Sequence, residues 1–351
     1  MPFNYFKQFG GKITSNEISR YTESPNWNRK AFQNLENTSM DFSLSALPGF
    51  LKKRFWDQTQ REPEKPIPVE SPDLDAFSTI TDKPKFIWFG HSVLLLQLEG
   101  KNILIDPMFG SNASPIAPFP TKRFSENTLK LIDHLPNIDA ILFTHDHYDH
   151  LDFQSIQKLK KREIKYYSGL GLGRHLRYWG IPNDKIEELD WWNSFTLGNI
   201  KITYTPTRHF SGRGLRDRGK SLWGGWVFET PQLKVYFSGD GGYGNHFSQI
   251  KDRFKHFDFA LIECGQYNEN WKQIHLFPNE SVKVGKEVNA DIVMPVHWGG
   301  FALAVHPWKE PVRKFVQHAT IQGLKYVVPR LGEIVNIGSD FPSDEWWEEY
   351  E

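Results

Sequence analysis

Three histidines and two aspartates fall within six consecutive residues, His145-Asp146-His147-Tyr148-Asp149-His150. They directly follow the apolar run at residues 140–144, which has the length and composition of a buried β-strand. Side chains two positions apart project to the same side of an extended chain. We therefore predict that His145 and His147 bind one metal ion and that Asp149 and His150, in the following turn, bind a second. Imidazole and carboxylate ligands together suit Zn²⁺, Mn²⁺ or Fe.

Three more residues of ligand type follow strand-like runs later in the chain. They are His209 after residues 202–205, Asp240 after residues 235–237, and His297 after residues 292–296. A strand can carry each of these side chains to the edge of a sheet, and a carboxylate can bridge two cations about 3.5–4 Å apart. The predicted ligands are His145, His147 and His209 for one ion, Asp149, His150 and His297 for the other, and Asp240 between them.

Length, charge and cysteine content limit the classes of protein that fit this chain. Its 351 residues suffice for one large domain or two modest ones. Lys+Arg and Asp+Glu are both 42, so no overall field favours nucleic acid, and we expect no nucleic-acid partner. The single cysteine, Cys264, permits no intrachain disulfide, and the N-terminus lacks the apolar core of a secretory signal. We predict a cytoplasmic protein.

The chain divides into three predicted regions. Residues 1–83 form an N-terminal arm and Pro-rich linker that pack on the body, because the prolines at 63, 66, 68 and 72 disfavour regular elements. Residues 84–340 form the main domain, and 341–351 form an acidic C-terminal tail. An amphipathic piece at 47–56 is expected to pack on the body, with membrane-surface or substrate contact as the alternative.

From residue 84 onward, strand patterns alternate with helical spacing. Strands are predicted at 86–89, 93–98, 102–105, 201–204, 223–228, 233–237, 259–262 and 292–296, and a helix at 153–161. Strands interleaved with helices favour a layered α/β architecture. No internal repeat of fixed short period is visible, although two diverged halves would not show in one sequence.

The ordered ligand set resembles the metallo-β-lactamase superfamily. Further motifs narrow the resemblance to N-acyl-phosphatidylethanolamine-hydrolysing phospholipase D and its bacterial relatives, over residues 84 to 335. These motifs are Gly90-His91-Ser92, Leu104-Ile105-Asp106-Pro107, Leu222-Trp223-Gly224-Gly225-Trp226, Ser238-Gly239-Asp240-Gly241-Gly242-Tyr243 and His297-Trp298-Gly299-Gly300-Phe301-Ala302-Leu303. The resemblance implies an αββα sandwich with two central mixed sheets flanked by helices. It also implies two divalent metal ions, Zn²⁺ first, with Mn²⁺ or Fe as alternatives.

Several residues outside the ligand set are candidates for supporting roles. Metal-bound histidines usually donate their second nitrogen to a carboxylate, so Asp106 or Asp146 is expected to orient a ligand, with turn capping as the alternative. His91 matches the family's Gly-His-Ser element, with a structural turn histidine as the alternative. His275 matches a histidine that lies near the active site of the lipid-cleaving relatives. The glutamine adjacent to it in that family is here Ile274, which leaves the local geometry open.

A basic run follows His209 and includes Arg213 and Arg216. A solvated loop is the ordinary interpretation, while arginines this close to a ligand would suit an anionic substrate because each offers paired donors to a phosphate. We therefore keep Arg213 and Arg216 as candidates for supporting the centre or contacting substrate.

The predicted function is a dinuclear metal-dependent hydrolase, a phosphodiesterase of the phospholipase D type acting through a metal-activated hydroxide. Asp149, Asp240 and His275 are the expected catalytic residues, and the expected substrate is a small molecule or an N-acylated glycerophospholipid, with peripheral membrane contact. A lactonase or carboxylic ester hydrolase on the same centre is the alternative. A non-catalytic metal-binding protein and an iron redox centre are less favoured. The sequence leaves the oligomeric state open.

Overall fold

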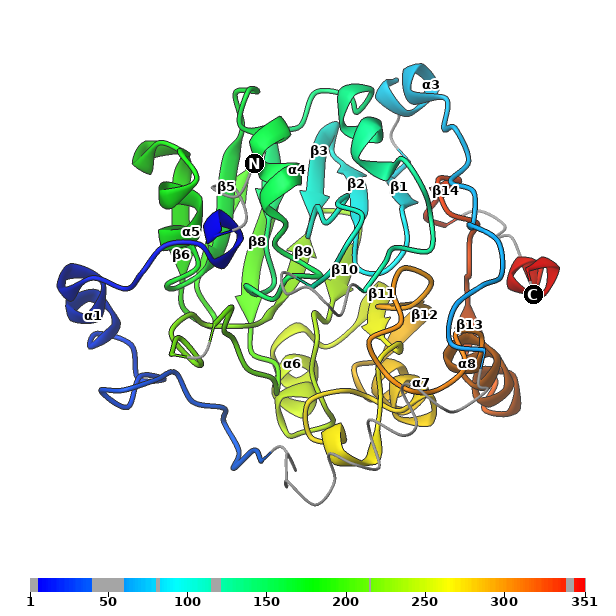
Figure 1. Ribbon diagram of the computed structural model, residues 1–351. Helices are drawn as coiled ribbons and strands as arrows, with labels where there is room; N and C mark the ends of the chain where they lie inside the picture. Colours follow the sequence, from blue (N-terminus) through cyan, green and yellow to red (C-terminus); the bar gives the residue numbers. More distant parts are fainter. Residues whose placement is uncertain are drawn as a thin grey trace.

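Two seven-stranded sheets lie face to face at the centre of the protein (Figure 1). The computed structural model describes residues 6–39, 60–79, 83–114, 121–214, 216–338 and 344–350, so the amphipathic piece expected at 47–56 lies outside the described residues. The first sheet contains, in spatial order, β14 (Ile334–Asn336), β1 (Lys85–Trp88), β2 (Leu94–Leu98), β3 (Lys101–Ile105), β4 (Ala140–Leu142), β5 (Lys165–Gly169) and β6 (Ile186–Leu189). The second contains β13 (Lys325–Tyr326), β12 (Ala290–Val296), β11 (Phe257–Glu263), β10 (Lys234–Phe237), β9 (Gly225–Glu229), β8 (Ile200–Thr205) and β7 (Ser194–Leu197).

The two sheets share one pairing pattern. In the first, β14, β1, β2 and β3 pair antiparallel, and β3, β4, β5 and β6 pair parallel. In the second, β7 to β10 pair antiparallel, and β10 to β13 pair parallel. The two halves of the domain therefore have the same strand-pairing pattern, although the sequence contains no visible repeat of fixed short period.

Alternating side chains of the strands divide between an inner and an outer core. In β1, Phe86 and Trp88 belong to the core between the sheets, whereas Ile87 joins the core on the outer face of the first sheet. In β11, Phe259 likewise faces inward, and Ala260 joins the outer core of the second sheet. This period of two follows from strand geometry and buries both faces of each sheet.

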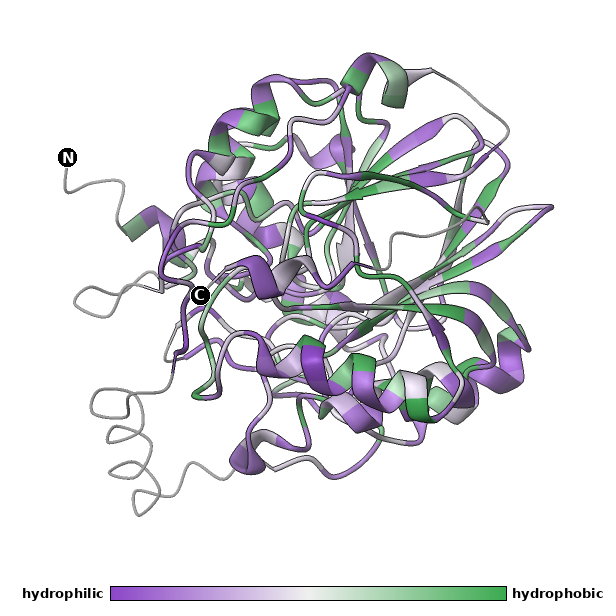
Figure 2. Ribbon diagram, turned by 90° about the vertical axis from the view of Figure 1, so that its right-hand side faces the viewer, coloured by the Kyte–Doolittle hydropathy of each residue, from purple (hydrophilic) through white to green (hydrophobic). Residues whose placement is uncertain are grey.

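Helices cover both outer faces, and the predicted αββα sandwich is thereby confirmed. On the first sheet lie α4 (Phe153–Leu159), α5 (Gly173–Tyr178) and the 3₁₀ helix η3 (Thr128–Asp133); on the second lie α6 (His246–Phe254), α7 (Pro278–Glu287) and α8 (Glu310–Ile321). Figure 2 shows hydrophilic and hydrophobic residues alternating along these helices, as expected where one helix face packs on a sheet. The helix predicted at 153–161 is present and ends at Leu159. The short helix α3 (Leu74–Ser78) adds Phe77 to the core on the outer face of the first sheet. The other short elements are α1 (Ser15–Tyr21), η2 (Phe6–Phe9), η4 (Asn183–Lys185), η5 (Glu269–Trp271) and η6 (Trp346–Glu349).

Described parts of both chain ends pack on the sandwich. Tyr21, Trp27 and Phe32 of the N-terminal segment, which is blue in Figure 1, are buried in the cluster that fills the space between the sheets. In the same segment, Gly11 N donates to His175 Nδ1 of α5 at 3.1 Å. Trp346 of the acidic tail is buried in the same cluster. No helix among the described residues is both long and apolar enough to cross a membrane.

Candidate metal centre

The loops that follow five strands meet at one edge of the sandwich. β3 and β4 are parallel neighbours, as are β10, β11 and β12, so their carboxyl ends lie together within each sheet. The residues just past these ends are the ones the sequence singled out. They are Asp106 after β3, His145 to His150 after β4, His209 after β8, Asp240 after β10 and His297 after β12.

Three imidazoles form the first donor group. His147 Nδ1 lies 2.9 Å from His145 Nε2 and 3.2 Å from His209 Nε2. All three rings are buried or nearly so, and their nitrogens lie close enough together to share one ion. The structure thus brings together the three residues predicted to bind the first ion.

The second donor group combines carboxylates with imidazoles. Asp149 Oδ2 lies 3.3 Å from His150 Nε2 and 3.2 Å from His297 Nε2. Asp240 Oδ2 lies 3.1 Å from His150 Nε2, 2.9 Å from His297 Nε2 and 3.8 Å from His145 Nε2. Asp240 therefore stands between the two groups, in the place predicted for a bridging carboxylate.

The outward nitrogens of several ligand rings have polar partners. His209 Nδ1 donates to the Ile274 carbonyl oxygen at 2.9 Å, which leaves a lone pair on the inward Nε2. His150 Nδ1 lies 2.8 Å from Asp106 Oδ2, and the same carboxylate oxygen accepts from Thr144 Oγ1 at 2.6 Å. Such partners fix the tautomer and orientation of a metal-bound histidine.

The imidazoles of the first group are held neutral. Burial, reinforced by neighbouring imidazoles, lowers the pKa of His145 and of His209 well below the usual value. Burial also lowers the pKa of His147 to about 4. Three neutral rings with nitrogens pointing at one spot suit a cation, because each can offer a lone pair.

In the second group, imidazoles and carboxylates stabilise each other's charges. Burial raises the pKa of Asp149 and Asp240, but the charges of the neighbouring imidazoles outweigh burial and hold both pKa values well below their usual range. Burial lowers the pKa of His150 and His297, but the carboxylates, Asp240 foremost, outweigh burial and raise both pKa values well above the usual one. Positive charge is therefore required here, whether protons or a metal ion supply it.

A metal ion fits this geometry on two counts. Donor atoms bound tetrahedrally at about 2.0–2.1 Å lie roughly 3.3 Å apart, close to the 2.9–3.3 Å separations of the donors around His147 and Asp149. In addition, the second oxygen of Asp240, Oδ1, is buried and has no hydrogen-bond partner among the described residues. A buried carboxylate oxygen without a hydrogen-bond donor is available to a cation, so the donor set fits divalent metal.

The two candidate orienting aspartates occupy different positions. Asp106 is fully buried and contacts the ligand His150 directly. Asp146 is also fully buried, but its side chain accepts hydrogen bonds from Gly212 N at 2.7 Å and from Ser221 Oγ, and lies 3.3 Å from His175 Nε2. Asp146 thus ties the loop after β4 to the loop before β9, whereas Asp106 contacts a ligand.

His91 and His275 both border the centre. His91 Nε2 lies 2.8 Å from Asp149 Oδ2, and burial lowers the pKa of His91 to about 3. The His275 ring stacks on that of His297, with centroids 5.4 Å apart and planes inclined by 9°. A His275 ring nitrogen lies within 4.8 Å of the ligand atoms of His209 and Asp240.

The sequence patterns did not reveal Glu263, which also borders the centre. Its fully buried carboxylate lies 2.5 Å from His275 Nδ1 and 3.5 Å from His297 Nδ1, and accepts from Leu276 N at 3.1 Å and Gly241 N at 3.2 Å. Glu263 ends β11, so an acidic residue closing an apolar strand, the signal that marked Asp240, would have found it.

The two candidate arginines differ in burial. The Arg213 guanidinium is buried and donates to the carbonyl oxygens of Asp146 at 2.7 Å, Leu151 at 2.8 Å and Gln8 at 2.7 Å through Nη2. It therefore braces the loop that carries the ligands and joins that loop to the N-terminal segment. Arg216 is exposed.

Three residues of this site have a strained backbone. His91 (φ 57°), Asp106 (φ 43°) and His297 (φ 68°) adopt left-handed conformations that non-glycine residues rarely adopt. Such conformations persist where the surrounding structure determines them, and they cluster at functional sites.

Comparison with known proteins places this geometry in a family. A family model described as a beta-lactamase superfamily domain matches residues 101–298. The chain belongs to the metallo-β-lactamase superfamily. Among solved structures, the Igni18 metallo hydrolase of Ignicoccus hospitalis superimposes with a TM-score of 0.58 at 21% identity, covering 74% of this chain and all of that one (100%). CmlA, a diiron β-hydroxylase of Streptomyces venezuelae, has a TM-score of 0.55 at 18% identity, covering 73% and 55%. At these identities the likeness shows the fold alone.

Curated relatives of this superfamily member extend the likeness along most of the chain. An uncharacterized protein of Mycobacterium tuberculosis is 36% identical over 333 residues, which is 93% of this chain and 88% of that protein. N-acyl-phosphatidylethanolamine-hydrolyzing phospholipase D 1 of Caenorhabditis elegans is 32% identical over 264 residues, 70% of this chain and 74% of the relative. The superfamily and these relatives identify the protein as a metal-dependent hydrolase, and its histidine and aspartate clusters are candidate sites for divalent metal.

Proposed function

We propose that the protein is a dinuclear phosphodiesterase of the phospholipase D type, acting on N-acylated glycerophospholipids or related phosphodiesters. The observation that carries the proposal is the convergence of seven predicted ligands into two adjacent donor groups with Asp240 between them. The phospholipase D relative that matches 70% of the chain supports the choice of substrate class.

In this proposal His145, His147 and His209 would hold one ion, Asp149, His150 and His297 would hold the other, and Asp240 would serve both. Bound at such a centre, divalent ions, Zn²⁺ first, lower the pKa of water toward about 7 and offset negative charge that develops on a phosphoryl group. Asp106 keeps the His150 proton on Nδ1, so that Nε2 remains a lone-pair donor. His91 holds Asp149 Oδ2 through Nε2.

His275 supplies the proton that the leaving oxygen needs. Its Nδ1 faces Glu263 Oε1 at 2.5 Å, which orients the ring and leaves Nε2 to face the substrate. Stacking on His297 fixes the plane of the ring beside the donor groups. No protein nucleophile is required, and Cys264 is a poor candidate because burial raises the pKa of its thiol.

A substrate panel on purified protein, with metal content measured on the same batch, tests the proposal. The panel contains an N-acylated phosphatidylethanolamine, a bis(aryl) phosphodiester, an acyl lactone and a carboxylic ester. We expect hydrolysis of the two phosphodiesters at two metal ions per chain. A strong preference for the lactone or the ester would refute the phosphodiester assignment while leaving the metal centre intact, and strong iron colour with electron transfer would refute the hydrolase.

The Asp240→Asn variant tests the bridging role separately. We expect it to lose activity and at least one metal ion while it remains folded, because an amide is a poor bridge between two cations. Unchanged turnover would contradict the role. A flotation assay with phospholipid vesicles tests the proposed peripheral membrane contact.

A further inference from the structure

A segment of the N-terminal arm, residues 31–39, lies against the loops that build the metal centre. We call it the arm segment. Phe32 N donates to Gly219 O at 2.8 Å, and Ser39 N donates to Gln273 Oε1 at 2.7 Å. Arg208, the neighbour of His209, donates from Nη2 to Asn37 O at 2.9 Å and from Nε to Thr38 Oγ1 at 3.1 Å. The arm segment is therefore bound by the loop that connects β8 to β9 and by the loop before α7.

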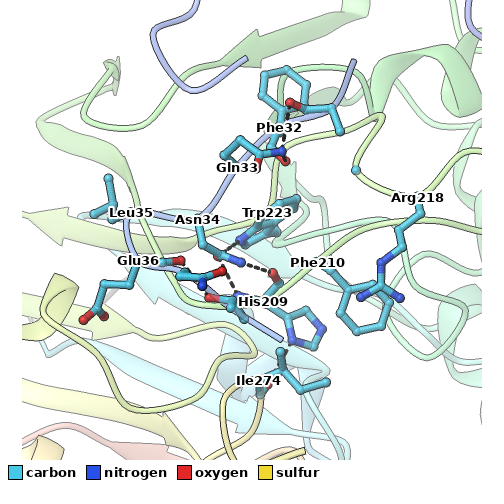
Figure 3. Close-up of a pocket in the computed structure, with 14 residues that line it drawn as sticks. Phe32, Gln33, Asn34, Leu35, Glu36, His209, Phe210, Arg218, Trp223 and Ile274 are labelled. Carbon is cyan, nitrogen blue, oxygen red and sulfur yellow. Dashed lines mark hydrogen bonds between the residues drawn. The ribbon is translucent and has the colours of Figure 1, made fainter. Parts of the chain in front are cut away.

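Asn34 is the residue through which the arm segment reaches a ligand (Figure 3). Its Nδ2 donates to His209 O at 2.8 Å, and its Oδ1 accepts from His209 N at 3.1 Å. The same Oδ1 accepts from Trp223 Nε1 at 2.9 Å. One amide side chain thus pairs with both main-chain polar groups of His209.

The main chain of His209 depends on Asn34 because it lies beyond the sheet. β8 ends at Thr205, so no strand ladder continues to His209. Within the part of the chain that the structure describes, both main-chain hydrogen bonds of His209 go to Asn34. By contrast, His297 N donates to His91 O at 3.0 Å, within the main domain itself.

The arm segment also forms one wall of a cavity beside His209. The cavity has a volume of about 470 Å³, and residues 31–38 line it opposite His209, Phe210, Arg218, Trp223 and Ile274 (Figure 3). Ile274 contributes a second restraint on the ligand, since its carbonyl oxygen accepts from His209 Nδ1. His209 is therefore fixed at its ring by the main domain and at its backbone by the arm.

We propose that the N-terminal arm completes the metal centre, with Asn34 as a positioning residue for His209. The Asn34 amide holds the His209 backbone where the ring can point Nε2 at the nitrogens of His145 and His147. Without it, the loop after β8 moves more freely and the first ion loses affinity. This proposal rests on the proposed metal site but does not depend on the identity of the substrate. A failure of the phosphodiesterase assignment would therefore leave it unaffected.

Zn²⁺ affinity of the metal-depleted full-length protein tests this directly. We expect Asn34→Ala to weaken one of the two Zn²⁺ sites about tenfold, the lower end of the effect of losing a residue that supports a ligand, in a competition titration with a chromophoric chelator. The visible spectrum of the Co²⁺-substituted protein should change with it. Asn37→Ala is the matched control, because Asn37 is exposed and keeps its backbone carbonyl bond to Arg208. This control should bind both ions as the unmodified protein does.

Two results would overturn the proposal. One is unchanged Zn²⁺ affinity and an unchanged Co²⁺ spectrum in Asn34→Ala. The other is an equal loss at both sites together with a lowered unfolding temperature of the metal-free protein, which would mark Asn34 as a general structural residue. If Asn34→Ala does not fold, Asn34→Asp replaces it. That variant keeps the oxygen that accepts from His209 N and removes the donor to His209 O, so the same site should weaken.

Discussion

Replacing Asp106 by asparagine tests whether the centre depends on a carboxylate that binds no ion. Asp106 Oδ1 accepts from Thr144 N at 2.8 Å, and Oδ2 accepts from Thr144 Oγ1 at 2.6 Å and faces His150 Nδ1 at 2.8 Å. Asparagine has the same shape but one acceptor oxygen fewer. In one orientation its NH₂ faces Thr144 N–H, and in the other it faces His150 Nδ1–H. Either way, a buried donor faces another donor.

The expected magnitude follows from that mismatch. If the His150 proton moves to Nε2 to escape the NH₂ group, the lone pair that should face the ion is lost. Removing such a supporting carboxylate typically lowers metal affinity about 10- to 100-fold, or about 1.4 to 2.7 kcal/mol. A buried unpaired donor costs a similar amount, about 1–3 kcal/mol, if the mismatch falls on Thr144 N instead.

The measurement is Zn²⁺ affinity by competition with a chromophoric chelator, with turnover recorded at saturating metal. Asp139→Asn is the matched control. Asp139 also accepts from a backbone amide, Asn102 N at 2.9 Å, and from Lys101 Nζ at 3.0 Å, but it precedes β4 and so lies at the opposite end of that strand. The reasoning is refuted if Asp106→Asn binds both ions as tightly as Asp139→Asn and keeps full turnover.

Three further outcomes are expected. His275→Gln should lower kcat about 10²- to 10⁴-fold on a phosphodiester with an alkyl leaving group. The loss should be much smaller on a phosphodiester with a nitrophenyl leaving group, which needs no proton. Equal losses on the two substrates, measured at unchanged metal content, would argue against proton donation. Burial, helped by the charge of Arg208, lowers the pKa of His246 to about 3, so the unfolded chain takes up a proton first and the free energy of unfolding should fall by about 1.4 kcal/mol per pH unit below about 6.5. Denaturant titrations at several pH values between 6.5 and 4.5 give the free energy of unfolding at each pH. This free energy should fall less steeply with decreasing pH in His246→Leu than in the unmodified protein, and an identical pH dependence would count against this. In Gly265→Ala the new Cβ would lie 1.5 Å from His297 O, so the variant should be destabilised by about 1–3 kcal/mol and bind Zn²⁺ more weakly; a melting curve and a metal titration matching those of the unmodified protein would contradict this.

Edge strands show where local patterns were insufficient. β5, β6 and β7 were not predicted. β6 and β7 are only partly buried at the ends of their sheets, whereas β5 is a central strand whose sequence, Lys165-Tyr166-Tyr167-Ser168-Gly169, forms no apolar run. β13 and β14, with two and three residues, are also terminal strands. A buried strand can be recognised in the sequence when it forms an apolar run, whereas an edge strand is identified mainly by its neighbour, which a single sequence does not reveal.

Residue types and local order determined much of this protein in advance. The apolar runs predicted the central strands other than β5, and the ligand-type residues directly after them predicted which side chains reach the sheet edge, because both depend only on near neighbours and on the period of an extended chain. The motif spacing was also sufficient for the family. These local patterns do not depend on the order in which the strands are arranged in the sheets.

Only the tertiary structure decided which of those residues meet. Strand order puts β4 and β12 in different sheets, and packing of the two sheets brings His150 to within reach of the same Asp240 oxygen as His297. It also places Glu263 behind His275, and Asn34 against a ligand 175 residues away in the chain. Contacts of this kind depend on how distant segments share a core, and no pattern of neighbouring residues encodes that arrangement.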